Sequence, residues 1–272
     1  MSLKGKAIFI TGGSRGIGRA IALKCAQDGA NIVIAAKTDA PHPVLPGTIY
    51  TVAEEIKAAG GECLPLKVDA RQETQIQEAV QKAVDHFGGI DIVVNNASAI
   101  NLTGTVQTSM SRFDLMMNVN VRATFATIQA CLPHLLKSDN PHVLTLSPPL
   151  NMRSKWFKKH VAYTMSKYGM SMCVLGMAEE FRDKGVAFNA LWPVTAIATD
   201  AFKAIDATIP LDCMRKPEIV ADAAYAIFNR EAKQCTGNFF TDEEILFAEG
   251  VENLAPYAMK EGAALIPDFF LE

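Results

Sequence analysis

The sequence lacks the features that mark several large classes of protein. Its 272 residues contain no apolar run of 18 or more, so we expect no membrane-spanning helix. Its six cysteines are scattered and form no Cys-x-x-Cys pair, which favours free thiols in a reducing compartment over a disulfide framework or a zinc site. The five histidines show no spacing typical of metal ligands, and no metal is predicted.

An excess of positive charge is also missing. The chain has 26 Lys and Arg against 29 Asp and Glu, which gives a net charge of −3. A domain that grips nucleic acid usually carries a basic excess, so nucleic acid is not an expected partner. Hydrophobic residues make up 49% and charged residues 20%, which excludes a disordered chain and allows a sizeable core.

Neither end of the sequence resembles a sorting signal. Residues 1–6 lead directly into a strand-like run, which leaves no room for a signal peptide. The last residues, Phe269-Phe270-Leu271-Glu272, do not match the peroxisomal Ser-Lys-Leu signal. We therefore expect a soluble cytoplasmic protein.

Short apolar runs alternate with longer helix-like stretches along the whole chain. The runs are Ala7–Thr11, Asn31–Ala36, Cys63–Val68, Ile90–Asn95, His142–Ser147, Val186–Leu191 and Asn238–Thr241. The helix-like stretches lie near 17–29, 50–60, 72–88, 111–137, 161–184 and 217–230. Continuous apolar runs of this length are typical of parallel strands buried on both faces. The alternation predicts one α/β domain over residues 1–272, a doubly wound parallel sheet of about seven strands with helices on both faces. Residues 243–272 are expected to pack on it as a C-terminal tail.

A glycine-rich turn follows the first of these runs and opens the first helix-like stretch. Gly12 suits a tight turn, Gly16 lets the backbone approach a pyrophosphate, and Gly18 lets the helix pack against the strand. The free amides at a helix N-terminus then face the phosphate charge. The sequence predicts dinucleotide contacts at Gly12, Ser14, Arg15, Gly16, Ile17 and Gly18.

Five motifs in order give the chain a family resemblance. The glycine turn has the spacing Thr-Gly-x-x-x-Gly-x-Gly, Asp69 follows the third run, and Asn95-Asn96-Ala97-Ser98 follows the fourth. Asn120 lies in a long helix-like stretch, and Tyr163 and Lys167 form a Tyr-x-x-x-Lys pair. Over residues 6 to about 241 the chain resembles the short-chain dehydrogenase/reductase family. That resemblance implies a Rossmann-type fold and a nicotinamide dinucleotide. It also places Asp69, Asn95 and Ala97 at the dinucleotide.

The Tyr163 and Lys167 side chains share one helical face because they are four residues apart. Tyrosine, with a pKa near 10, is a poor acid–base group at neutral pH, and a neighbouring ammonium lowers that pKa. The resemblance assigns Tyr163 as general acid/base, Lys167 to the nicotinamide ribose, and Asn120 to a water that links Lys167 to solvent. It also implies a homodimer or homotetramer built through the helices at 111–137 and 161–184.

The end of the second run favours NADP(H) over NAD(H). An acid there would hydrogen-bond the ribose hydroxyl of NAD, but the sequence has Lys37 at this point. Arg15 in the glycine turn offers a second cation for a 2′-phosphate. Asp39 lies close enough to leave NAD as the alternative.

The chain departs from the family at two strand ends. The second serine that the family carries after its fifth strand aligns with Pro148, so Ser147 either takes over its role or the role is lost. Pro193 and Thr195 follow the sixth run, where the family binds the nicotinamide. These departures, with the tail Pro-Asp-Phe-Phe-Leu, resemble the hydroxysteroid dehydrogenase-like branch. Its members often carry a sterol-carrier domain, and this sequence ends before one would begin.

The segment before Tyr163 suggests an apolar small-molecule substrate. Residues expected to line or cover its pocket are Leu150, Met152, Trp156, Phe157, Phe202 and Met214. The cations of this segment, Arg153, Lys155, Lys158 and Lys159, either bind an acidic group of the substrate or are simply solvated. The favoured function is alcohol–carbonyl oxidoreduction on a lipid-like substrate. The alternatives are a catalytically weak dinucleotide-binding protein and a related dehydratase or hydratase.

Overall fold

The computed structural model describes residues 1–41, 47–200, 202 and 210–272. The loops expected at 37–47 and 200–216 therefore fall partly outside the described residues. Of the residues expected to cover the substrate pocket, Phe202 and Met214 are both described. Within the described ranges, no helix is long and apolar enough to cross a bilayer.

Seven parallel strands form one sheet in the order β3-β2-β1-β4-β5-β6-β7. Their bounds are β1 Ala7–Thr11, β2 Asn31–Ala36, β3 Glu62–Lys67, β4 Ile92–Asn95, β5 His142–Thr145, β6 Ala187–Trp192 and β7 Phe239–Thr241. This confirms the predicted doubly wound sheet. The strand order reverses between β1 and β4, and ligands of such sheets bind outside the strand carboxyl ends at this point.

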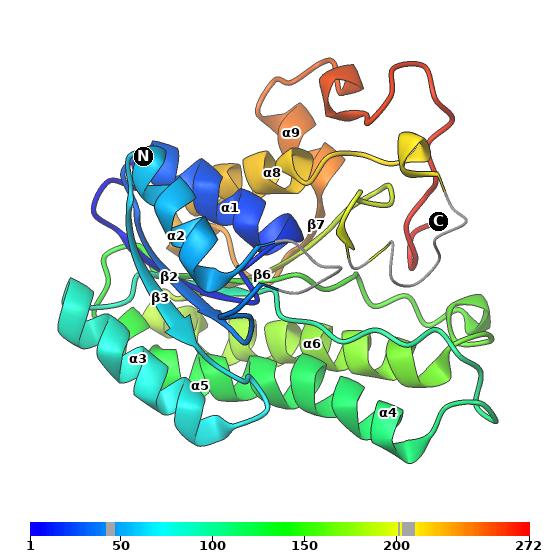
Figure 1. Ribbon diagram of the computed structural model, residues 1–272, viewed down its shortest axis with the longest axis horizontal. Helices are drawn as coiled ribbons and strands as arrows, with labels where there is room; N and C mark the ends of the chain where they lie inside the picture. The colour runs from blue at the N-terminus through cyan, green and yellow to red at the C-terminus, as the bar shows by residue number, and fades with distance from the viewer. Residues whose placement is uncertain (42–46, 201, 203–209) are drawn as a thin grey trace.

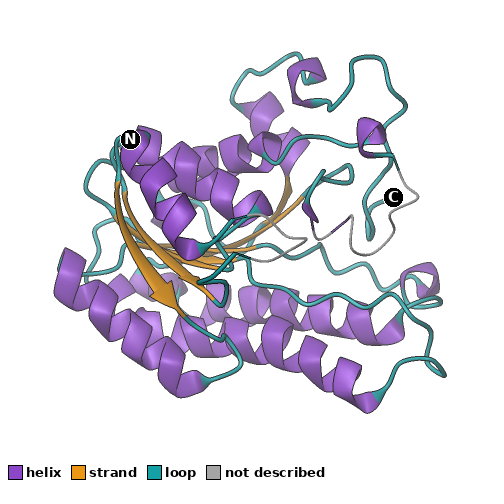
Figure 2. Cartoon of the chain, in the orientation of Figure 1, coloured by secondary structure: helices purple, strands orange, loops and turns teal. Residues whose placement is uncertain are grey.

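Helices cover both faces of the sheet (Figures 1 and 2). On one side lie α1 Gly16–Gln27, α2 Ile49–Ala58, α8 Glu218–Phe228 and α9 Asp242–Ala248. On the other lie α3 Glu73–Phe87, α4 Met110–Met116, α5 Ala123–Leu135 and α6 Val161–Glu180. Single 3-10 turns fall at Ser154–Trp156, Arg182–Lys184, Leu211–Cys213, Ala232–Gln234 and Ala255–Tyr257.

The expectation of one helix over 111–137 was wrong in one respect. A π-helical segment, Met117–Arg122, separates α4 from α5. The wider turn carries Asn120 inward, where its side chain is fully buried. Such π segments often occur at functional sites.

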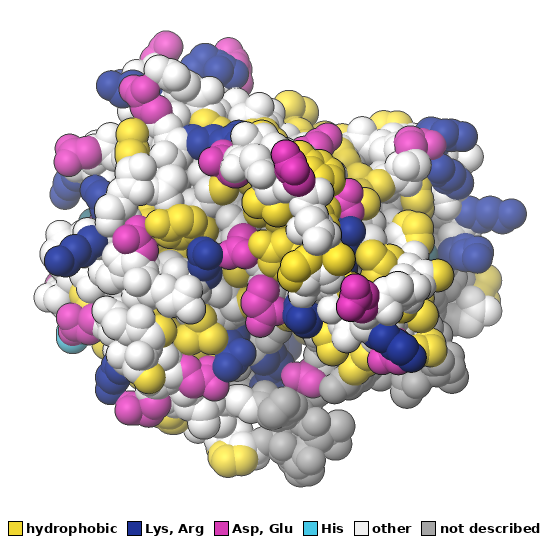
Figure 3. All heavy atoms as spheres, turned by 90° about the horizontal axis from the view of Figure 1, so that it is seen from above, with side chains coloured by type: hydrophobic (Ala, Val, Ile, Leu, Met, Phe, Trp, Pro, Cys, Tyr) yellow, Lys and Arg dark blue, Asp and Glu magenta, His cyan; other side chains and the backbone are white. Residues whose placement is uncertain are grey.

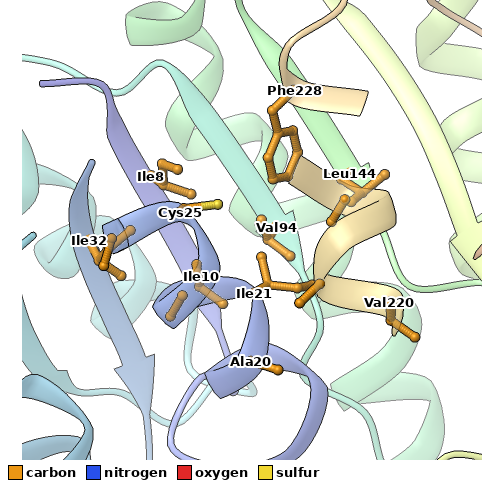
Figure 4. Packing of buried hydrophobic residues seen from close by; sticks show 14 of the residues in the cluster. Ile8, Ile10, Ala20, Ile21, Cys25, Ile32, Val94, Leu144, Val220 and Phe228 are labelled. Carbon is orange, nitrogen blue, oxygen red and sulfur yellow. The ribbon is translucent and has the colours of Figure 1, made fainter. Parts of the chain in front are cut away.

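The core consists of two apolar layers, one on each face of the sheet. Along β1, Ile8 and Ile10 belong to the layer beneath α1 and α8, whereas Phe9 belongs to the opposite layer. Figure 4 shows Ile21 of α1 and Phe228 of α8 among the residues packed over Ile8 and Ile10. Successive strand residues point to opposite faces, so a strand buried on both faces must be apolar throughout. This explains why the strands are continuous apolar runs.

The C-terminal tail runs antiparallel to the segment that follows β6. The Ala196 N–H donates to the Ile266 carbonyl, and the Asp268 N–H donates to the Val194 carbonyl, both at 2.9 Å. In Figure 1 the red end of the chain descends beside this segment. The final residues are thereby held at the carboxyl end of the sheet.

Candidate active site

The glycine turn is shaped by close approach of two backbone segments. Gly12 and Gly16 have φ of +71° and +56°, in the left-handed region that favours glycine. A Cβ at Gly12 would lie 2.9 Å from the Ala97 Cα. A Cβ at Gly18 would lie 2.4 Å from the Asn96 Nδ2. Side chains are therefore excluded at these positions, and the first amides of α1 remain open to a ligand.

Asn96 and Thr11 clamp this turn, and sequence reasoning did not single out either residue. The Asn96 Nδ2 donates to the carbonyls of Thr11 and Gly12 at 3.0 and 2.9 Å. The Thr11 Oγ1 accepts the N–H groups of Asn96 and Ala97, both at 3.2 Å. The pair of asparagines at the end of β4 was the sequence pattern that could have revealed this clamp. Asn95 is buried, with its Oδ1 unpartnered, and Asn96 ties β4 to the turn.

Cationic side chains stand at the carboxyl end of β2. The Arg15 Nη2 donates to the Thr38 Oγ1 at 2.9 Å, and Lys37 is exposed beside it in the chain. The Asp39 carboxylate is engaged elsewhere, since its Oδ2 lies 2.9 Å from the Lys67 Nζ. Asp39 was the residue that kept NAD as an alternative cofactor in the sequence analysis. Its carboxylate instead forms an ion pair with Lys67.

Asp69 follows β3 and forms a bidentate ion pair with Arg71. The Arg71 Nε lies 3.0 Å from each carboxylate oxygen of Asp69. The hydrogen bonds from Arg71 lower the pKa of Asp69, and the charge of Lys37 lowers it further. Asp69 is therefore an ionised group near the cations of the β2 end.

Tyr163 and Lys167 lie on the inner face of α6, and both are buried. The Lys167 Nζ donates to the Leu146 carbonyl at 2.9 Å and lies 5.1 Å from the centroid of the Trp192 ring. Burial lowers the pKa of Lys167 to about 8. The ammonium thus lies beneath the ends of β5 and β6, and burial brings its pKa closer to neutral pH.

Burial raises the pKa of Tyr163 well above its usual range, and the charge of Asp268 raises it further. This is opposite in direction to the lowering by Lys167 that the sequence led us to expect. The C-terminal tail contributes to this burial and supplies Asp268. Phe270 is fully buried, and its ring centroid lies 6.2 Å from that of Tyr163. The tyrosine is closed off from solvent in this arrangement.

Asn120 uses its side chain to fix the segment after β4. Its Oδ1 accepts the Ala99 N–H at 2.7 Å, and its Nδ2 donates to the Ala99 carbonyl and to the Ser166 Oγ, both at 2.9 Å. The Ser166 Oγ donates in turn to the Tyr163 carbonyl at 2.8 Å. Asn120 thereby links the Asn95–Ser98 motif to the helix turn that carries Tyr163.

The loop between β5 and α6 forms one wall around Tyr163. Leu150, Trp156 and Phe157 pack into the apolar cluster that contains Tyr163 and Phe270, as expected. The expectation that Met152 would line the pocket was wrong, because its side chain is 69% exposed. Met214 is fully buried outside this cluster, beneath the segment whose Met259 N–H donates to its carbonyl. Phe202 is half-buried.

The sequence profile of the short-chain dehydrogenase family matches residues 6–210. The chain belongs to this family. It is 62% identical over 270 residues to hydroxysteroid dehydrogenase-like protein 2 of Danio rerio and 60% identical over 271 residues to that of Homo sapiens. These matches cover 99% of this chain but 65% and 64% of the relatives, so the chain spans less than two thirds of their length. The predicted branch of the family is confirmed.

Solved structures of the family superpose closely. A Xanthomonas campestris protein described as a dehydrogenase is 53% identical, with a TM-score of 0.98 and full coverage of both chains. A short-chain dehydrogenase of Mycobacterium thermoresistibile is 49% identical, with a TM-score of 0.95 over 100% of this chain and 96% of its own. Two more distant structures, 20% and 24% identical, are bound to NAD and to NADP and share the fold.

The carboxyl end of the sheet fits the dinucleotide that this family binds. Three buried polar atoms without a hydrogen-bond partner face this end: the Asn95 Oδ1, the Ser147 Oγ and the Thr195 Oγ1. Asn95 is the last residue of β4, whereas Ser147 follows β5 and Thr195 follows β6, with Pro193 two residues before it. Buried polar atoms normally have partners, so unpartnered ones at the carboxyl ends of these strands indicate a ligand site.

Proposed function

We propose that this chain is an NADP(H)-dependent oxidoreductase that interconverts an alcohol and a carbonyl on an apolar, lipid-like substrate. The observation that carries the proposal is the placement of Tyr163 and Lys167. Both side chains lie on one buried face of α6, against an apolar cluster and beside the strand ends that follow the glycine turn. An acid–base pair at the ligand-binding edge of such a sheet serves proton transfer to a substrate oxygen.

The glycine turn, at Gly12, Ser14, Gly16, Ile17 and Gly18, holds the pyrophosphate. Lys37 and Arg15 pair with the 2′-phosphate, a preference supported by the pairing of Asp39 with Lys67. The adenine and nicotinamide ends contact Asp69, Asn95, Ala97, Pro193 and Thr195.

When bound, the dinucleotide supplies or accepts a hydride at its nicotinamide ring. The Tyr163 hydroxyl donates a proton to the substrate oxygen in reduction and takes one from it in oxidation. Lys167, protonated beside the Leu146 carbonyl, contacts the nicotinamide ribose. Its positive charge lowers the free energy needed to form the Tyr163 phenolate. The Ser147 Oγ, buried and unpartnered, is assigned to hydrogen-bond the substrate oxygen in place of the serine that Pro148 replaces.

Proton exchange with solvent is assigned to the π-helical segment. The Asn120 side chain already forms hydrogen bonds with Ala99 and Ser166. The water is therefore assigned to the backbone of the π-helical segment Met117–Arg122. The exposed apolar residues of α5 and α6 are assigned to a homo-oligomer interface.

Turnover of NADPH with a panel of lipid aldehydes, ketones and 3-oxoacyl thioesters tests this function. We expect wild type to oxidise NADPH with at least one class and Tyr163→Phe to lose this turnover. Tyr225→Phe is the control, because its hydroxyl bonds Asp28, away from the site. Tight NADPH binding without turnover across the panel would instead favour the dinucleotide-binding protein.

A further inference from the structure

The last four described residues, Phe269–Glu272, which we call the closing segment, fill the apolar space in front of Tyr163. The Phe270 ring lies 5.3 Å from Tyr168, 5.8 Å from Trp192 and 5.9 Å from Trp156, measured between centroids. The Trp192 Nε1 also donates to the Phe269 carbonyl at 2.9 Å. A side chain of the protein thus occupies the place where an apolar substrate must lie to reach the tyrosine.

The closing segment is held in a strained conformation. Phe270 has a φ of +73° and is the one non-glycine residue in the left-handed region among the residues described. A bulky side chain adopts this region only where its surroundings compensate the cost. Strain of this kind favours release of the closing segment when another group replaces Phe270 in its contacts with the surrounding rings.

The far end of the closing segment binds a pair of cations. The Glu272 Oε1 accepts the Asn151 Nδ2 at 2.7 Å, and its Oε2 pairs with Arg153 and lies 3.0 Å from the Lys155 Nζ. In Figure 3, Lys and Arg side chains gather at the right-hand edge, the end of the molecule at which the loop between β5 and α6 lies in Figure 1. These three side chains are about half exposed, and ion pairs of that exposure contribute little to stability. Another carboxylate or phosphate can therefore replace Glu272 at small cost.

Resting on the proposed function, we propose that the closing segment stands in for the substrate, which is an apolar carbonyl or alcohol bearing an anionic group. The apolar part of the substrate takes the place of Phe270 against Tyr163. Its anionic group takes the place of the Glu272 carboxylate on Arg153 and Lys155. These two cations then select the substrate, and displacement of the segment uncovers the tyrosine.

Both tryptophans of the chain contact Phe270, so their fluorescence reports on the closing segment. The probes are 9-oxodecanoate and its methyl ester, which share the oxo group and the chain but differ at one end, where the ester has a methyl group in place of the negative charge. We expect the acid to change tryptophan emission at a concentration about tenfold lower than the ester. The R153Q/K155Q variant should abolish that difference. Lys158→Gln is the matched control, because Lys158 stands on the same loop outside the Glu272 contacts, and it should keep the difference.

Glu272→Gln gives a second, independent readout. Removal of the Glu272 charge should weaken the attachment of the closing segment to Arg153 and Lys155. The ester should then change tryptophan emission at a concentration about two- to fivefold lower than in wild type, as expected for loss of an exposed ion pair. Equal response to acid and ester in wild type, or discrimination that survives in R153Q/K155Q, would overturn the proposal. This binding measurement needs no turnover. NADPH oxidation without charge discrimination would refute this inference alone, and charge discrimination without any NADPH oxidation would refute the proposed function alone.

Discussion

The ring of Phe270 lies 6.2 Å from the ring of Tyr163 and leaves the tyrosine 4% exposed. The two residues come from distant parts of the chain, the start of α6 and the C-terminal tail. Burial, to which Phe270 contributes, raises the pKa of the hydroxyl that the proposed reaction requires. In the proposed reaction, the tail must therefore move away before Tyr163 can exchange a proton with a substrate.

Phe270→Gly should be at least as stable as Phe270→Ala. Glycine normally costs about 0.5–1 kcal/mol relative to alanine, but a φ of +73° reverses that preference. Both variants lose the buried ring, and both should be less stable than wild type. Urea unfolding curves measure the difference. A clearly more stable alanine variant would show that Phe270 is not strained.

Lys37→Asp should weaken NADPH binding by about 10- to 100-fold, the effect of a lost charge-assisted hydrogen bond at an anion. NADH binding should change far less, because NADH has no 2′-phosphate. Fluorescence titration with both cofactors measures the two dissociation constants. Lys82→Asp on α3 makes the same charge change away from the site and should leave both values unaltered. Parallel losses for NADPH and NADH would contradict the assignment.

Gly18→Ala should weaken binding of either dinucleotide by at least about tenfold, because a Cβ there meets the Asn96 Nδ2 at 2.4 Å and displaces the clamp on the glycine turn. Gly176→Ala in α6 is the control, since its Cβ would meet nothing within 4 Å. That control should gain up to about 1 kcal/mol of stability from helix propensity. Calorimetric titration measures the dinucleotide affinity of each variant, and thermal unfolding measures its stability. Undiminished dinucleotide affinity in Gly18→Ala would count against the role of the turn.

The stability gained by Asp268→Asn should grow with pH. Burial raises the pKa of Asp268 from 3.8 to about 7, against the lowering effects of the Phe269 N–H and of Lys167. The folded state therefore keeps a proton that the unfolded state loses, and the wild type loses stability as pH rises from about 4 to about 7. Unfolding curves at pH 5 and pH 8 measure this, with the exposed Asp212→Asn as control. Parallel pH profiles for wild type and Asp268→Asn would contradict it.

Met172→Glu should reduce the oligomeric mass. Exposed apolar side chains gather on α5 and α6, namely Phe125, Met165, Met172 and Leu175, and patches of this kind usually mark an interface. Light scattering after gel filtration measures the mass. Met152→Glu introduces the same charge at a more exposed loop position and should have no effect on mass. An unchanged mass in Met172→Glu would place the interface elsewhere.

The sheet was predictable because its strands are buried on both faces and so are continuous apolar runs. The ends of the runs were less certain, and β4 begins at Ile92 rather than Ile90. The glycine turn and the Tyr163–Lys167 pair were visible as local spacings, which a helix or a turn translates directly into proximity.

Other features depend on contacts between distant segments and leave no local pattern. The helix predicted over 111–137 concealed a π-helical segment, because the bonds of Asn120 to Ala99 and Ser166 are tertiary. The approach of Phe270 to Tyr163 was equally hidden. The motif that implied a lowered tyrosine pKa says nothing about the tail that buries the hydroxyl.

The central claim is hydride exchange with proton transfer by Tyr163, and transfer of deuterium tests it most directly. Wild type is incubated with a carbonyl substrate from the panel and with NADPH deuterated at either face of nicotinamide C4. We predict deuterium on the carbinol carbon of the alcohol from one of the two labelled cofactors, and none with Tyr163→Phe. Alcohol formed without deuterium from either cofactor, or labelled equally well by Tyr163→Phe, would contradict the account.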